Sequence, residues 1–128
     1  MSKAFMSKAM VIDDSRAVRM ILTKILEEIG YEVCQAADGK QALAVADREA
    51  GLSLILVDWN MPEMNGLEFV KRFRSDARFS SIPLMMVTTE TDIGQVVAAL
   101  DAGANEYVMK PFTKDVIADK LRLLGVIE

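Results

Sequence analysis

The stretch at residues 55–66, ILVDWNMPEMNG, decides how this chain is expected to fold. Its apolar start leads into one aspartate, Asp58, and turn-forming residues follow at Pro62, Asn65 and Gly66. A short, continuous apolar run that ends in turn residues is typical of a strand covered on both faces in a parallel sheet. We therefore expect Asp58 to stand at the carboxyl end of a buried strand.

Three further apolar runs have the same continuous pattern, and a fifth run is more polar. The continuous runs are at residues 9–12, 84–87 and 107–109, and the polar one, at 31–36, contains Glu32 and Gln35. Between them lie amphipathic segments, in which apolar side chains recur every three or four positions. Strands that alternate with helices five times predict a three-layer α/β sandwich with a parallel sheet. The polar run suits an edge strand.

The expected helices carry residues that cap helix ends. Ser, Thr and Asp accept hydrogen bonds from the first free main-chain N–H groups, and glycine adopts the positive φ at which helices often end. Asp38 and Asp92 are each followed by glutamine three positions later, a pattern similar to a capping box. The expected N-caps are Ser15, Asp38, Asp92 and Thr113, and the expected helix ends are Gly30 and Gly103.

Composition restricts the class of protein. The 128 residues fit a single domain that can bury a core, and no stretch reaches the roughly 18 unbroken apolar residues of a membrane helix. The N-terminal segment lacks the apolar region of a secretory signal, and the single cysteine, Cys34, agrees with a reducing compartment. We therefore expect a cytoplasmic protein without membrane contact, in which residues 1–7 form a flexible tail.

Charge and the lack of histidine exclude several functions. The formal net charge is −4 and no long basic cluster occurs, so nucleic-acid binding is not expected. The sequence contains no histidine, which excludes histidine-based catalytic triads, imidazole metal sites and a phosphohistidine on this chain. Any chemistry must therefore rest on carboxylates, hydroxyls and lysine.

Polar residues directly follow four of the expected strands. Because the carboxyl ends of parallel strands share one edge of a sheet, where ligands of open α/β sheets bind, we expect these residues to lie together. Three carboxylates at one edge repel one another, so a cation must balance them, either Lys110 or a divalent metal ion. Ligands that are all oxygens favour magnesium or manganese over zinc. The residues concerned are Asp13, Asp14, Asp58, Thr88, Thr89, Lys110 and Pro111.

These residue types match the needs of phosphoryl transfer. A carboxylate can act as a nucleophile toward phosphorus and form an acyl phosphate. The transferred group carries negative charge, so a metal ion, a cationic side chain and a hydroxyl donor are expected around it. Asp58, Lys110 and Thr88 would supply this set together with the metal ion.

The sequence resembles the receiver domains of two-component response regulators, and among them the stand-alone chemotaxis regulators of the CheY type. The resemblance rests on the acidic pair after the first strand, on DxxMPxMxG from Asp58 onward, on Thr88 and on Lys110–Pro111. The stretches DDSRAVRMIL, VDWNMPEMNGLEF and YVMKPFT carry it most clearly. It extends over residues 8–124 and implies one receiver domain at 1–128, with a flavodoxin-like (βα)5 fold and strand order 2-1-3-4-5.

The resemblance also implies how a metal ion and a phosphoryl group would be held. Asp58 would be the phosphoacceptor. Mg²⁺ would be bound directly by Asp14, Asp58 and the main-chain carbonyl of Asn60, and Asp13 would hold a metal-bound water. Lys110 and Thr88 would contact the phosphoryl group. The Lys110–Pro111 peptide bond is expected to be cis.

A switch is implied as well. The Thr88 hydroxyl would move toward the oxygens of the added group, and Tyr107 would turn inward, which changes the face made by the fourth helix, the fifth strand and the fifth helix. Asn60 and Glu90 match positions that tune dephosphorylation. Two departures from the family pattern are the large Thr89 and the stretch TDIG at residues 91–94, which lacks the lysines of enteric regulators.

Partners follow from the same resemblance. Without its own histidine, the chain would receive the phosphoryl group from a sensor histidine kinase of the CheA type. Its phosphorylation-dependent output partner would be a protein such as the flagellar motor switch, and a phosphatase is a further candidate partner. The chain would be a signalling protein, an enzyme only toward its own phosphorylation and dephosphorylation.

Three alternatives use similar residues. A phosphorelay intermediate, or phosphate sink, would share every site residue but pass the group to a second histidine protein. A haloacid-dehalogenase-like phosphatase also uses a strand-end aspartate with Thr, Lys and Mg²⁺, but its nucleophile lies on the first strand in a DxDx[TV] motif. A flavodoxin-like FMN carrier would need a phosphate-binding loop after the first strand, which this sequence lacks.

Overall fold

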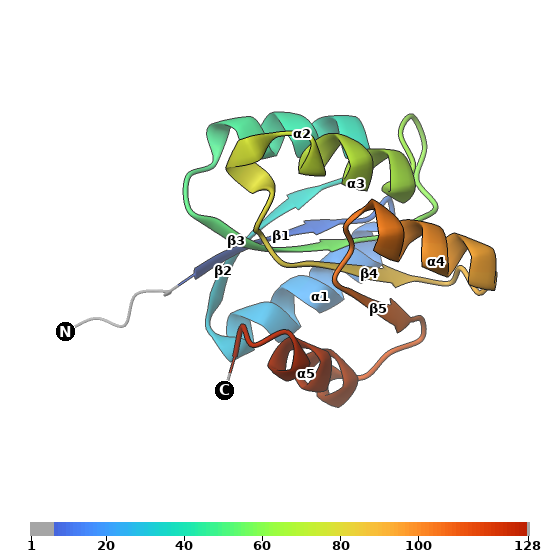
Figure 1. Cartoon of the computed structure of the whole chain (residues 1–128). Helices are drawn as coiled ribbons and strands as arrows, with labels where there is room; N and C mark the ends of the chain where they lie inside the picture. Colours follow the sequence, from blue (N-terminus) through green and yellow to red (C-terminus); the bar gives the residue numbers. More distant parts are fainter. Residues whose placement is uncertain (1–6, 128) are drawn as a thin grey trace.

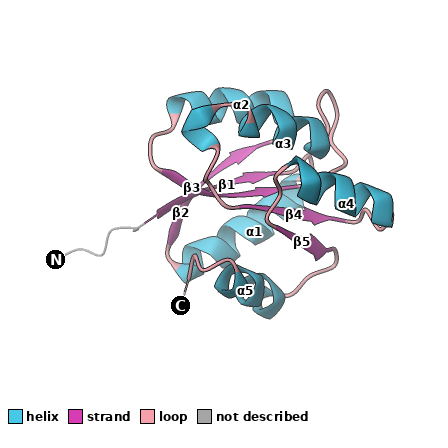
Figure 2. Cartoon of the chain, viewed as in Figure 1, coloured by secondary structure: helices cyan, strands magenta, loops and turns pink. Residues whose placement is uncertain are grey.

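A computed structural model of the chain describes residues 7–127. Five parallel strands form one sheet in the order β2-β1-β3-β4-β5, which confirms the expected topology (Figures 1 and 2). The more polar strand β2 is an edge, as expected, and β5 is the other edge. The strands are β1 Ser7–Ile12, β2 Tyr31–Ala36, β3 Leu52–Val57, β4 Leu84–Thr88 and β5 Glu106–Met109.

Helices cover both faces of the sheet. In Figure 1, α2, α3 and α4 lie on one face, and α1 and α5 lie on the other. The helices are α1 Arg16–Ile29, α2 Gly39–Arg48, α3 Gly66–Arg74, α4 Ile93–Ala102 and α5 Lys114–Leu123, with a short 3₁₀ helix η1 at Ala77–Phe79. None of the helices within residues 7–127 has the length and apolar character that a membrane span requires.

The core consists of two apolar clusters, one on each face of the sheet. Successive side chains of a strand point to opposite faces, so Met10 and Ile12 enter one cluster while Ala9 and Val11 enter the other. The first cluster packs under α2, α3 and α4 around Phe69 and Phe73, and the second packs under α1 and α5. The continuous apolar runs in β1, β3 and β4 are therefore strands with two buried faces, whereas the run in β5 is only partly buried.

The predicted caps are confirmed. Ser15, Asp38, Asp92 and Thr113 each accept a hydrogen bond from the main-chain N–H three residues later. Gly30 and Gly103 end α1 and α4 with φ of 125° at both positions.

One boundary and the burial of one strand differ from expectation. Ser7 belongs to β1 and pairs with Tyr31 of β2, so the expected tail at 1–7 is wrong for Ser7, and residues 1–6 lie outside the described part. Met109 of β5 is 39% exposed, because its strand has a neighbour on one side only.

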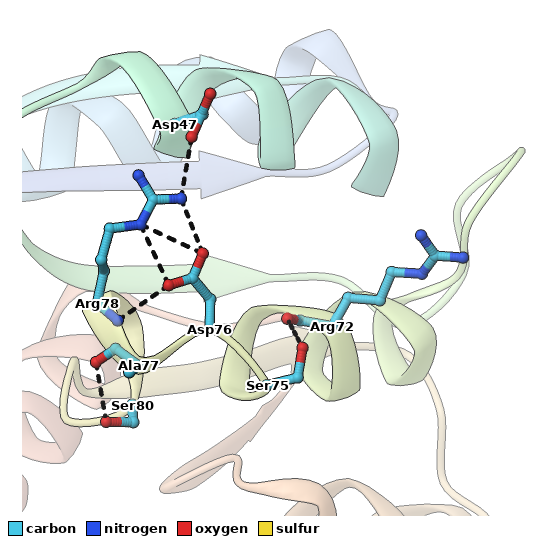
Figure 3. Close-up of polar contacts among 7 residues, drawn as sticks. All are labelled: Asp47, Arg72, Ser75, Asp76, Ala77, Arg78 and Ser80. Atoms are coloured by element: carbon cyan, nitrogen blue, oxygen red, sulfur yellow. Dashed lines mark hydrogen bonds and ion pairs between the residues drawn. The ribbon is translucent and has the colours of Figure 1, made fainter.

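The connection from α3 to β4 is held by ion pairs that the apolar patterns do not predict. Asp76 accepts from the main-chain N–H of Arg78, and the Arg78 guanidinium binds both Asp76 and Asp47 of α2, at 2.8 and 2.9 Å (Figure 3). These groups are largely exposed, and such pairs each contribute about 0.2–1 kcal/mol.

Arg74 ties the end of α4 to the rest of the molecule. Its guanidinium donates to the carbonyls of Gly103 and Phe79 and to Asn105 Oδ1, at 3.0, 2.8 and 2.9 Å. Asn105 Oδ1 also accepts from the N–H of Leu84, at the start of β4. The C-terminal end of α4 is thereby joined to α3, η1 and β4.

Candidate functional site

The sheet brings the predicted site residues to one edge. Asp13 follows β1, Asp58 follows β3 and Lys110 follows β5. The main chain of each still pairs with a neighbouring strand, because their N–H groups donate to the carbonyls of Ala36, Ile12 and Thr88 at 3.1, 2.9 and 2.9 Å. The three side chains therefore project from positions that the sheet itself fixes.

Lys110 lies between two buried carboxylates. Its Nζ is 2.8 Å from Asp13 Oδ2 and 3.3 Å from Asp58 Oδ2. Asp13 is 1% exposed and Asp58 is 5% exposed. Burial raises the pKa of Asp13, although the hydrogen bond from Lys110 opposes this. Burial lowers the pKa of Lys110, but the bond to Asp13 and the charge of Asp58 outweigh it, so the net pKa is raised. The ammonium group stays charged.

The acidic residues form a cluster that suits a hard cation. Asp13, Asp14 and Asp58 each offer one oxygen, and these oxygens lie within 4.8 Å of one another. Both Asp13 oxygens already accept hydrogen bonds, Oδ1 from the N–H of Ser15 and Oδ2 from Lys110. Asp58 Oδ1 is buried and has no partner among residues 7–127, and Asp14 is exposed. The oxygens left for a cation are thus Asp58 Oδ1 and those of Asp14.

Thr88 and Tyr107 meet at the turn between β4 and α4. Thr88 is fully buried, and its Oγ1 accepts from the N–H of Glu90 at 3.2 Å. The Tyr107 hydroxyl donates to the carbonyl of Glu90 at 3.0 Å. The Tyr107 side chain is half-buried against the α3 and α4 side of the core, and burial, with the charges of Glu90 and Asp58, raises its pKa to about 12. Thr88 of β4 and Tyr107 of β5 therefore both form hydrogen bonds with the main chain of Glu90.

The turn after Asp58 needs a glycine. The N–H of Gly66 donates to the carbonyl of Trp59 at 2.8 Å, and a Cβ at position 66 would collide with the main chain of Asp58 and Trp59. Trp59 is buried and Asn60 is exposed. The sequence marked Gly66 as a turn residue but did not predict this close approach to Asp58.

The sequence analysis also missed the N–H of Ser15 as a hydrogen-bond donor to Asp13. The spacing of an aspartate and a residue two positions later, typical of an Asx turn, could have indicated this bond.

The other expected residues lie where the sequence placed them. Thr89 is exposed at the end of β4, and the Lys110–Pro111 peptide bond is cis, as expected. Beside them, Val18, Ile21, Thr89, Lys110, Pro111 and Phe112 line a largely apolar cavity of about 340 Å³.

Comparison with known families agrees with this geometry. The model of the response regulator receiver domain matches residues 9–122. The chain therefore belongs to the response regulator receiver domain family. This membership favours the receiver interpretation over the phosphatase and FMN-carrier alternatives.

Within that family, curated chemotaxis regulators are among the similar proteins. The chemotaxis protein CheY1 of Helicobacter pylori is 46% identical over 118 residues, 91% of this chain and 95% of that protein. The chemotaxis protein CheY homolog of Campylobacter jejuni is 41% identical over 115 residues, 89% of this chain and 88% of that protein. This chain is thus a receiver domain homologous to the CheY regulators, which are signalling proteins of two-component systems.

Solved structures share the fold. Vibrio cholerae CheY4 has a TM-score of 0.86 and 36% identity, covering 92% of this chain and 98% of that one. The receiver domain of a Pseudomonas aeruginosa sensor histidine kinase, described with a magnesium ion coordinated in the active site cleft, has a TM-score of 0.82 and 26% identity, covering 93% and 98%. The cluster of Asp13, Asp14 and Asp58 fits such a magnesium site.

Proposed function

We propose that this protein is a stand-alone response regulator that accepts a phosphoryl group on Asp58 from the phosphohistidine of a sensor kinase. One observation carries the proposal: the buried Asp58 carboxylate has one oxygen beside Lys110 and the other without a hydrogen-bond partner among residues 7–127, at a sheet edge where Asp13 and Asp14 also lie. A carboxylate oxygen would form a bond to phosphorus as the phosphorus–nitrogen bond to the donor histidine breaks. Water later releases inorganic phosphate and restores the carboxylate.

Each neighbour of Asp58 has a proposed task. Asp14 and Asp58, with the main-chain carbonyl of Asn60, would hold Mg²⁺, and Asp13 would act through a bound water because both its oxygens are engaged. When bound, the ion neutralises charge on the phosphoryl oxygens. Lys110 would contact a phosphoryl group on Asp58, because its ammonium group already contacts the Asp58 carboxylate.

The proposed switch uses the residues that hold Glu90. Thr88 would exchange the N–H of Glu90 for a phosphoryl oxygen, since a hydroxyl donates readily to a charged acceptor. The β4–α4 turn would lose one of its two supports, and Tyr107, whose hydroxyl donates to the Glu90 carbonyl in this structure, would turn further inward. The turn and α4 would then favour a new arrangement, and the face of α4, β5 and α5 would change its affinity for a partner. Asn60 and Glu90 would tune dephosphorylation.

Similarity to CheY proteins supports a role in chemotaxis. The kinase would be of the CheA type and the output partner a flagellar motor switch, with a phosphatase as a further partner. One receiver domain would extend over the chain. The pairing of Asp58 with Lys110, and the free oxygen of the same group, support phosphotransfer rather than a purely structural acidic cluster.

The proposal is tested by phosphorylation with acetyl phosphate. In Mg²⁺, intact-protein mass spectrometry should show one added phosphoryl group, and the fluorescence of Trp59, the single tryptophan, should respond to Mg²⁺ and again to beryllofluoride. Asp58→Asn should remove the phosphoryl group and the second response. Asp119→Asn, at an exposed position of α5, should leave both unchanged. Phosphorylation of Asp58→Asn at the normal rate would contradict the assignment, and efficient return of the group to a histidine phosphotransfer protein would favour a relay.

A further inference from the structure

Asp14 is the member of the acidic cluster whose side chain has the least support. Lys110 contacts both Asp13 and Asp58. The Asp14 side chain is exposed, and within the described part of the chain it forms no hydrogen bond and no ion pair. Its place in the cluster therefore depends on the main chain that carries it.

Arg19 of α1 holds the peptide group that leads into Asp14. Its Nη1 donates to the main-chain carbonyl of Asp13 at 2.7 Å. That carbonyl and the N–H of Asp14 belong to one planar peptide unit, so a bond that fixes the oxygen also fixes the plane in which the Asp14 Cα lies. The pairing of β1 with β2 ends just before this carbonyl, at the N–H of Asp13, which donates to Ala36. Arg19 thus supports the main chain where strand pairing ends.

Two further hydrogen bonds orient the Arg19 guanidinium. Its Nε donates to Gln35 Oε1 on β2 at 3.0 Å, and Gln35 Nε2 donates to Thr23 Oγ1 of α1 at 3.1 Å. Because a guanidinium is planar, bonds from Nε and Nη1 together fix its orientation. Among residues 7–127, Arg19 forms no ion pair. Its contact with the site is therefore a bond to a main-chain carbonyl.

The charge of Arg19 and its hydrogen bond would have opposite effects on a cation at the acidic cluster. A guanidinium repels a nearby metal ion, so loss of the charge alone would tighten binding. Loss of the hydrogen bond would free the peptide group and let Asp14 move. This would weaken Mg²⁺ in particular, because that ion demands a nearly ideal octahedral geometry. The direction of a change in affinity therefore shows which property of Arg19 matters.

We propose that Arg19 is a positioning residue of the cation site: through the Asp13 carbonyl it holds the Asp14 carboxylate where it can share an ion with Asp58. This rests on the proposed function, whose metal-binding step it specifies. Arg19 acts through the main chain and is not itself a ligand. Loss of such a residue behind the direct ligands typically lowers metal affinity about 10–100-fold.

Calorimetric titration of the full chain with Mg²⁺ tests the proposal. Arg19→Ala should raise the dissociation constant of Mg²⁺ about tenfold. Gln35→Ala, at an exposed position, removes only the partner that orients Arg19 and should give a smaller change in the same direction. Arg16→Ala is the matched control, since it removes the same charge from an exposed position in the first turn of α1 and breaks no hydrogen bond of the described residues. Unchanged or tighter binding of Mg²⁺ by Arg19→Ala would overturn the proposal.

Two further measurements separate positioning from a merely structural role, with circular dichroism showing that the variants are folded. Ca²⁺ accepts flexible coordination, so Arg19→Ala should weaken Mg²⁺ more than Ca²⁺. In an Asp14→Asn background, Arg19→Ala should change the dissociation constant of Mg²⁺ much less than in the natural sequence, because Arg19 acts through Asp14. Equal fold-changes for the two ions, or in the two backgrounds, would overturn the proposal.

Phosphorylation of Asp58 by acetyl phosphate is measured on the same samples. If Asp58 is phosphorylated but Arg19→Ala binds Mg²⁺ as tightly as the natural sequence, the inference fails alone. If Mg²⁺ binds but Asp58 is not phosphorylated, the proposed function fails, and the titrations still decide the role of Arg19. If the natural sequence does not bind Mg²⁺, both fail.

Discussion

At the scale of single residues, the most consequential contact is the one between Lys110 and two buried aspartates. Removing a carboxylate from water is unfavourable, and the ammonium group offsets this only in part, which is why the pKa of Asp13 remains raised. Keeping these carboxylates buried at the site therefore lowers the free energy of unfolding. Functional sites are where such conflicts are expected.

Asp13→Asn is expected to stabilise the protein at neutral pH. Because the folded-state pKa of Asp13 is raised, the stability that this group contributes is largest in acid and is lost as the pH rises through the raised pKa. Asparagine keeps the oxygen that accepts from Ser15 and has no charge to bury. Urea unfolding should show a gain over the natural sequence at about pH 7 that disappears below about pH 4. Asp101→Asn, at an exposed position, should show no such gain, and a loss at neutral pH for Asp13→Asn would contradict the reasoning.

Gly66→Ala is expected to lower the free energy of unfolding by about 1–3 kcal/mol, because the added Cβ meets the main chain of Asp58 and Trp59. Gly94→Ala is a matched control at the start of α4, where the added Cβ meets only the Asp92 side chain, at 3.1 Å. The control should be neutral or slightly stabilising. Urea unfolding followed by Trp59 fluorescence measures both. Equal effects at the two positions would mean that the contact with Asp58 is unimportant.

The sequence predicted which residues meet at the site, but not how they contact one another. Asp13, Asp58 and Lys110 could be placed together because strand ends of a parallel sheet share an edge. Which carboxylate oxygen accepts which hydrogen bond depends on main-chain donors such as the N–H of Ser15 and on side-chain rotamers. Sequence patterns do not predict these contacts, so only the structure shows that Asp58 Oδ1 has no partner among residues 7–127.

At the scale of elements, α4 is held unevenly. Its C-terminal end is tied down by Arg74, whereas the described contacts at its N-terminal end are the Asp92 cap and the turn at Glu90. The sequence predicted α4 with both of its caps, because caps are local. It did not predict Arg74 as a tie, because Arg74 and Gly103 lie 29 positions apart. It also missed η1, since three residues are too few for a periodic signal.

Arg74→Ala is expected to loosen the end of α4. The change leaves the carbonyls of Gly103 and Phe79 without their donor, which should lower the free energy of unfolding by about 1–3 kcal/mol. Hydrogen exchange should become faster in the segment from Ala99 to Glu106 and remain unchanged in α1. Arg72→Ala is the control, since the Arg72 guanidinium makes no contact among the residues drawn in Figure 3. Unchanged exchange at the end of α4 would contradict the role of Arg74.

At the scale of the whole molecule, the acidic edge joins strands from distant parts of the chain. The contacts of Lys110 with Asp13 and Asp58 connect positions 97 and 52 residues apart. A divalent ion that binds Asp14 and Asp58 would bind only the folded chain, so it should shift the folding equilibrium.

Mg²⁺ is therefore expected to raise the free energy of unfolding by about 2.7 kcal/mol at a concentration one hundred times its dissociation constant. Thermal unfolding with Mg²⁺, and with EDTA, measures the shift. Asp14→Asn should reduce it strongly, whereas Asp119→Asn on α5 should not. An equal shift in both variants would point to a general effect of salt instead of a site.

The span of the Lys110 contacts has a consequence during protein synthesis. A chain released from the ribosome only as far as β4 presents Asp13 and Asp58 without the ammonium group that lies between them in the finished fold. Such an intermediate carries an unbalanced pair of carboxylates and lacks the edge strand that supplies the lysine. If Asp58 accepts a phosphoryl group as proposed above, this reactivity would require the last strand, and a chain that stops before β5 would lack it.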